Sequence, residues 1–107
     1  MIPPTDADIE DLVRRLVEKF HPERVVFFGS RCSGTPRPDS DVDLLVLMDY
    51  EGSNYRAAVE LLRALRPRFP VEFVIRRAED AAERYRLGDP VLREALDTGR
   101  VLYQRVA

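Results

Sequence analysis

The segment from Asp41 to Met48, with the sequence DVDLLVLM, constrains the fold more than any other part of the chain. Its two acidic residues are followed by apolar residues on both faces of an extended chain, a pattern typical of a central strand that helices cover. A second run of strand-forming residues, from Arg24 to Phe28, stops at Gly29. We therefore expect a small sheet whose two buried strands are joined by a loop.

Helical periodicity and helix caps mark the segments around these strands. Thr5 and Asp8 form a capping box ahead of apolar residues at helical spacing. In the first half of the chain we expect a helix from Thr5 to Phe20, a strand at 24–28, a loop at 29–40 with room for one helical turn from Ser30, and a strand at 41–48. In the second half we expect a helix marked by apolar residues from Ala58 to Phe69, a strand at 71–75 and a helix at 78–86. A last helix should have Asp89 as its cap, Pro90 at its first position and Gly99 beyond its end. This alternation predicts one layered domain over residues 1–107, with Val101 to Tyr103 completing the core.

Composition excludes several classes of protein. The net charge of -2 argues against a general nucleic-acid binder, which would need a strongly basic surface. No apolar run approaches the length of a membrane span, and the amino terminus lacks the pattern of a secretory signal, so we expect a cytoplasmic protein without a membrane role. Cys32 is the single cysteine, and its expected state is a reduced thiol.

Gly29 and Ser30 directly follow a predicted buried strand. Glycine allows a close approach of the backbone to a ligand, and free amides at the start of a helix favour an anion, so these residues could hold a triphosphate. The same pair is also what an ordinary turn with a helix cap would show. The motif alone therefore leaves both interpretations open.

Asp41 and Asp43 are two positions apart on a predicted strand, so their carboxylates project from one face, roughly 6 to 7 Å apart along the chain. Glu72 lies in a strand with apolar neighbours, where a charge is costly unless a cation or good hydrogen bonds compensate it. The alternative is structural, with one aspartate as a cap and the other acids paired with arginine. If instead the three acids share one face, they suit Mg²⁺, and two such ions could support in-line transfer of a nucleotidyl group.

The spacing Gly29-Ser30, ten residues, Asp41-Val42-Asp43, within VVFFGSRCSGTPRPDSDVDLLVL, resembles the signature of the minimal nucleotidyltransferases of the DNA polymerase β superfamily. The likeness extends through Val71 to Val74 and the closing segment PVLREALDTGRVLY. It implies an α+β fold, the nucleotidyltransferase palm, with a small three-stranded mixed sheet in the order 1-2-3, packed with helices in the chain order αβ(α)βαβαα.

The resemblance also implies roles for individual residues. Gly29 and Ser30 would bind the triphosphate, and Asp41 and Asp43 would ligate two Mg²⁺ or Mn²⁺ ions. Glu72 would hold the ion that activates the acceptor hydroxyl, although the family usually has aspartate at this position. Arg31 matches an arginine that contacts phosphate, and a surface ion pair is the competing interpretation.

Many stand-alone members of this family are antitoxins paired with a helical HEPN-domain ribonuclease toxin. The resemblance therefore implies transfer of AMP from ATP to a tyrosine of such a toxin, in a type VII-like system, with a homodimer or a hetero-oligomer left open. Two alternatives remain: a non-catalytic nucleotide-binding antitoxin that acts by binding, and an enzyme that adenylylates a small molecule such as an antibiotic. The short chain has little room for the extra helical domain that small-molecule enzymes carry.

Overall fold

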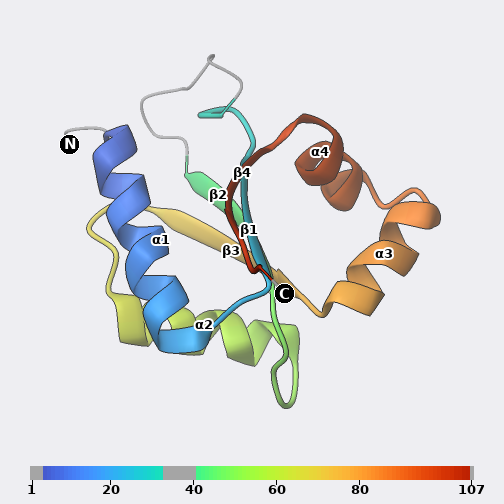
Figure 1. The fold of residues 1–107 in the computed structure, drawn as a ribbon, viewed down its shortest axis with the longest axis horizontal. Coiled ribbons are helices and arrows are strands. Elements are labelled where there is room, and N and C mark those ends of the chain that lie inside the picture. The colour runs from blue at the N-terminus through green and yellow to red at the C-terminus, as the bar shows by residue number, and fades with distance from the viewer. Residues whose placement is uncertain (1–3, 33–40, 107) are drawn as a thin grey trace.

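The computed structural model describes residues 4–32 and 41–106, which form alternating helices and strands (Figure 1). The elements are α1 (Asp6–Phe20), β1 (Arg24–Phe28), β2 (Val42–Leu47), α2 (Asn54–Leu65), β3 (Val71–Arg76), α3 (Ala78–Arg86), α4 (Pro90–Thr98) and β4 (Arg100–Gln104). Ser30 to Cys32 form a turn, and the rest of the helical turn predicted from Ser30 would fall at residues 33–40, outside the described part.

The strands form a mixed sheet in the order β3-β2-β1-β4. β1 pairs antiparallel with β2 and β4, whereas β2 and β3 are parallel. The predicted order of the first three strands is confirmed, but the prediction of three strands was wrong, because Arg100–Gln104 adds a fourth at the edge. This strand was difficult to predict from the sequence, because its residues are exposed or half-buried and its pairing with β1 shifts register between Val25 and Val26.

Helices cover both faces of the sheet (Figure 1). One face packs against α1 and α2, and its core contains Leu44 and Phe73. The opposite face packs against α3 and α4 in a smaller apolar cluster that consists of Val26, Phe28, Leu45, Leu47, Ala81, Leu92 and Ala95. β1 and β2 are therefore buried on both sides, as the apolar runs predicted.

Local signals at the helix ends account for most boundaries. The capping box is present, with the Thr5 amide donating to Asp8 and the Asp8 amide donating to Thr5 Oγ1 at 2.8 and 3.1 Å. α2 ends at Leu65, although the apolar pattern continued to Phe69. Pro67 explains the difference, because proline disfavours helical geometry in the residue before it, and Arg66 takes a left-handed conformation with φ of 44°. Within the described residues, none of the helices combines the length and apolar character that crossing a membrane requires.

Candidate active site

The predicted site residues meet at one end of the sheet. β1 ends at Phe28, immediately before Gly29 and Ser30. β2 runs antiparallel to β1 and begins at this same end, where Phe28 lies opposite Asp43. β3 is parallel to β2, and Glu72 is the register partner of Asp43. Segments far apart in the sequence are thus neighbours, because antiparallel and parallel pairing place the end of β1 beside the starts of β2 and β3.

Asp43 and Glu72 project from the face of the sheet that α3 and α4 cover. Their neighbours Leu44 and Phe73 lie in the core beneath α1 and α2, and successive side chains of a strand point to opposite faces. Leu45, two residues after Asp43, already belongs to the apolar cluster beneath α3 and α4. The acidic residues therefore lie at the edge of that cluster, where the cover of the helices ends.

Partial burial and the neighbouring carboxylates together determine the pKa of Asp43. Its partial burial is the largest cause, followed by the charge and hydrogen bond of Glu72 and by the charges of Asp41 and Glu94, and together these raise its pKa to about 6. Asp41 and Glu72 are exposed, so they can reach a ligand from solvent. A cation bound among these groups would relieve the repulsion that raises this pKa.

The exposure of Glu72 differs from what the sequence predicted. Its apolar neighbours suggested a buried charge that needed compensation, yet the side chain is exposed, and β3 is an edge strand of the sheet. Its proximity to Asp43, rather than burial, makes it a candidate ligand.

Gly29 adopts a conformation that only glycine accepts easily, with φ of 89°. A Cβ atom added at this position would collide with the Oδ2 atom of Asp43. The sequence predicted that Gly29 allows the backbone to come close to a ligand. In the structure the absence of a side chain at Gly29 also allows the Asp43 carboxylate to lie against the turn. The amide of Cys32 donates to the carbonyl of Gly29 at 3.1 Å, and Ser30 and Arg31 are half-buried in the turn between them.

The donor set fits a hard divalent cation in kind, since carboxylate oxygens are the ligands that Mg²⁺ takes. Among the described residues no three acidic, histidine or cysteine side chains are close enough to enclose an ion by themselves. Mg²⁺ commonly uses one or two carboxylates together with waters and substrate phosphates. Asp43 with either neighbour would therefore hold an ion only in combination with oxygens from a nucleotide.

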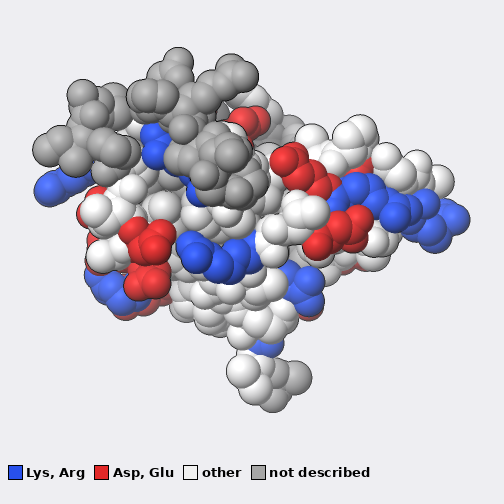
Figure 2. All heavy atoms as spheres, turned by 90° about the horizontal axis from the view of Figure 1, so that it is seen from above, with Lys and Arg blue, Asp and Glu red and all other residues white. Residues whose placement is uncertain are grey.

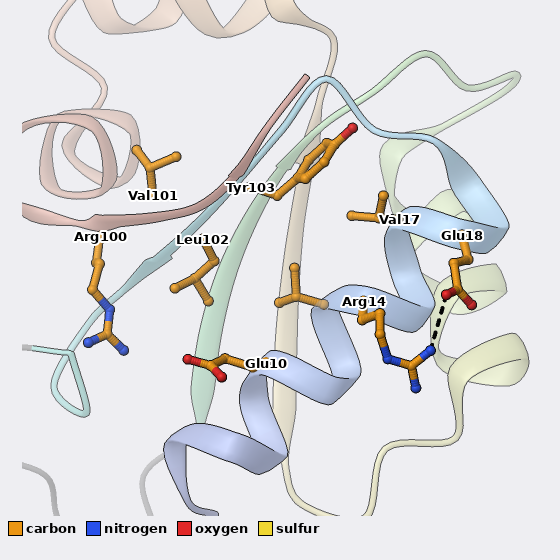
Figure 3. Close-up of a pocket in the computed structure, with 9 residues that line it drawn as sticks. Glu10, Arg14, Val17, Glu18, Arg100, Val101, Leu102 and Tyr103 are labelled. Atoms are coloured by element: carbon orange, nitrogen blue, oxygen red, sulfur yellow. Dashed lines mark hydrogen bonds and ion pairs between the residues drawn. The ribbon is translucent and has the colours of Figure 1, made fainter. Parts of the chain in front are cut away.

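The surface of the described residues has two further features. A groove of about 650 Å³ between α1 and β4 has an apolar floor that includes Val17 and Leu102, with Glu10 and Arg100 at its rim (Figure 3). Viewed from the end of the sheet at which β1 stops, acidic and basic side chains are interspersed (Figure 2).

The mixed sheet with covering helices is the fold of the nucleotidyltransferases, and comparison with known families bears this out. A family model described as the nucleotidyltransferase domain matches residues 9–102. The chain therefore belongs to the nucleotidyltransferase domain family, which confirms the resemblance seen in the sequence. No curated protein matches the chain.

Solved structures with the same fold come from toxin–antitoxin complexes. One, described as a toxin–antitoxin with AMP-PNP, aligns with a TM-score of 0.57 and 24% identity over 90% of this chain and 73% of that chain. Another, from the toxin–antitoxin MntA-HepT, aligns with a TM-score of 0.55 and 18% identity over 94% of this chain and 74% of that chain. At these identities the likeness establishes the fold.

The raised pKa of Asp43 predicts that its charge destabilises the metal-free protein. Below pH 3.8 the carboxyl is protonated in both the folded and the unfolded state, so the charge costs nothing. The cost grows as pH rises from 3.8 to about 6 and is complete above that value. Asp43→Asn should therefore raise the free energy of unfolding at pH 7.5 by about 1 kcal/mol, after a discount for solvent screening.

Thermal unfolding in the presence of a chelator, measured from pH 4 to pH 8, tests this prediction. The gain in stability from Asp43→Asn should become smaller as pH falls from about 6 to 3.8. Asp49→Asn, which changes an exposed aspartate, is the matched control. A variant less stable than the parent at pH 7.5 would contradict the electrostatic account.

Proposed function

We propose that the chain is a metal-dependent nucleotidyltransferase that transfers AMP from ATP to a hydroxyl group of a partner protein. The observation that carries this proposal is the pairing of Asp43 with Glu72 on adjacent strands, beside the Gly29-Ser30 turn. Carboxylates on one face next to a phosphate-binding turn are what transfer of a nucleotidyl group needs, because the reaction moves a highly charged group.

In this reaction the acceptor oxygen forms a bond to the α-phosphorus of ATP, the bond from that phosphorus to the bridging oxygen breaks, pyrophosphate leaves and the hydroxyl proton is released. Gly29 and Ser30 would hold the triphosphate, with Arg31 beside them. Asp41 and Asp43 would bind Mg²⁺ or Mn²⁺ together with phosphate oxygens, and Glu72 would complete the acceptor side. Bound divalent cations would supply neutralisation of the charge on the reacting phosphate.

The acceptor is proposed to be a tyrosine on a helical toxin of the HEPN class, with this chain as its antitoxin in the cytoplasm. Support comes from the solved relatives, whose descriptions name toxin–antitoxin complexes and, in one case, AMP-PNP. The exposure of Asp41 and Glu72 also supports an acceptor that approaches from outside. A docked partner would supply the orientation and water exclusion that a core of this size provides only in part.

A second candidate function is neutralisation of the toxin by binding alone. The glutamate at position 72, where the family usually has aspartate, favours it, because a longer side chain would hold the catalytic ion differently. Adenylylation of a small molecule stays the third alternative. Both transfer reactions need ATP and the acidic residues, whereas neutralisation by binding alone does not, so nucleotide binding is the first property to measure.

Calorimetry with Mg²⁺ and ATP tests the nucleotide site directly. The parent should bind the metal–nucleotide complex, and the Asp41→Asn, Asp43→Asn double variant should bind it at least about tenfold more weakly, since each lost charge-assisted contact is worth roughly 1 kcal/mol or more. Glu79→Gln changes an exposed acid on α3 and should leave binding unchanged. Equal affinity of parent and double variant would make the aspartate pair structural.

A further inference from the structure

α4 presents three sides with different surroundings. Leu92 and Ala95 lie in the apolar cluster against the sheet. Arg93 and Asp97 face α3, where the Arg93 Nε atom donates to the Tyr85 carbonyl at 2.8 Å and the Tyr85 hydroxyl donates to Asp97 at 2.7 Å. The third side therefore contains the residues at the remaining helical positions.

That third side carries Val91, Glu94 and Thr98, which are three and four positions apart and so form one stripe. The stripe points away from α3, and Gly99, directly after α4, lies against Phe27 near the end of β1 where the acids lie. The charge of Glu94 acts on Asp43, whereas Asp97, on the α3 side of the same helix, is not among the groups that do so. Glu94 is exposed, and no described residue bonds to its carboxylate.

We propose that Glu94 is a specificity-determining residue whose carboxylate accepts a hydrogen bond from a ribose hydroxyl of the bound nucleotide. This inference rests on the proposed function and adds a residue to its nucleotide site. It assigns to Glu94 the recognition of the nucleotide's sugar through one of its hydroxyl groups.

The position of Glu94 relative to the other acids favours the nucleotide over the acceptor. α4 packs on β1, and Gly99 at its end lies against Val26 and Phe27 of that strand. Glu94 therefore approaches Asp43 from the β1 side, on which the Gly29-Ser30 turn lies, whereas Glu72 approaches from the β3 side. The triphosphate is proposed to bind at that turn, so Glu94 is nearer to the nucleotide than to the acceptor.

The chemistry of a carboxylate narrows the ligand further. An unpaired negative charge would be repelled by phosphate oxygens, so Glu94 has to face neutral donors. The ribose provides hydroxyl donors and is attached directly to the α-phosphate that Asp43 would hold through a cation. Val91, which is 40% exposed on the same stripe, offers apolar surface to the carbon atoms of the sugar.

Calorimetry with Mg²⁺ and ATP, 2′-deoxy-ATP or 3′-deoxy-ATP tests this proposal. The parent should bind ATP about tenfold more tightly than the analogue that lacks the contacted hydroxyl, as expected for a hydrogen bond to a charged group. Glu94→Ala should weaken ATP binding by a similar factor and leave the analogue unaffected, so that discrimination disappears. Glu94→Gln keeps a carbonyl acceptor and should retain part of the discrimination between ATP and the analogue.

Glu79→Ala, which removes one exposed charge from α3, is the control and should discriminate like the parent. The proposal would be overturned if the parent bound ATP and both analogues equally. It would also be overturned if Glu94→Ala bound all three nucleotides more tightly, because that result would show that Glu94 only repels the phosphates. In either case binding that depends on Asp43 would leave the proposed function standing. A parent that binds no nucleotide would remove both.

Discussion

Glu72→Gln should reduce AMP transfer by at least about a thousandfold while changing the affinity for Mg²⁺ and ATP by no more than about threefold. Glu72 would hold the cation on the acceptor side, and the loss of such electrostatic stabilisation of the transition state typically costs several kcal/mol. Gly29 and Ser30, together with the aspartate pair, would still bind the nucleotide. Single-turnover transfer with saturating ATP separates the two effects, since binding then no longer limits the rate.

Two further variants make this test specific. Glu72→Asp restores the shorter side chain usual in the family and should keep or raise the transfer rate. Glu79→Gln, at an exposed position on α3, should transfer like the parent. An unchanged single-turnover rate for Glu72→Gln would exclude Glu72 as a ligand and leave it an exposed acid whose main effect is on Asp43.

The helices and the central strands were predictable because their signals are local. The Thr5 capping box and the Asp89-Pro90 start are read from neighbouring residues, and both are present in the structure. β4 was not predictable in the same way, since it is an edge strand with Val101 54% exposed, and its identity as a strand depends on pairing with β1 about seventy-five residues earlier. Long-range pairing of this kind leaves little trace in a short segment.

Some residues of the candidate site could likewise be predicted from the sequence, and others could not. The Gly29-Ser30 pair and the two aspartates were found from a spacing motif, and Glu72 from a charge within an apolar strand. The structure brings Asp43 and Glu72 together, but Glu72 is exposed, so the reasoning that singled it out was only partly right. Glu94 carried no signal, because an acid on the outer side of an amphipathic helix is ordinary and only the packing of α4 on β1 brings it near Asp43.

The proposed role of the chain as a protein-modifying enzyme predicts a defined covalent change in its partner. The partner is expected to be the helical protein encoded beside it, with a tyrosine that reaches Asp43 and Glu72 from outside. Because transfer attaches AMP and releases pyrophosphate, each modified tyrosine gains about 329 Da. The Asp41→Asn, Asp43→Asn double variant is the matched control, since it would lose the metal–nucleotide complex and still be able to contact the partner.

Intact-mass spectrometry of that partner, after incubation with the chain, Mg²⁺ and ATP, is the most direct test of the central claim. The account predicts a shift of about 329 Da, or a multiple of it, with the parent chain and none with the double variant. An unmodified partner whose activity both the parent and the double variant neutralise equally would contradict enzymatic transfer and establish inhibition by binding.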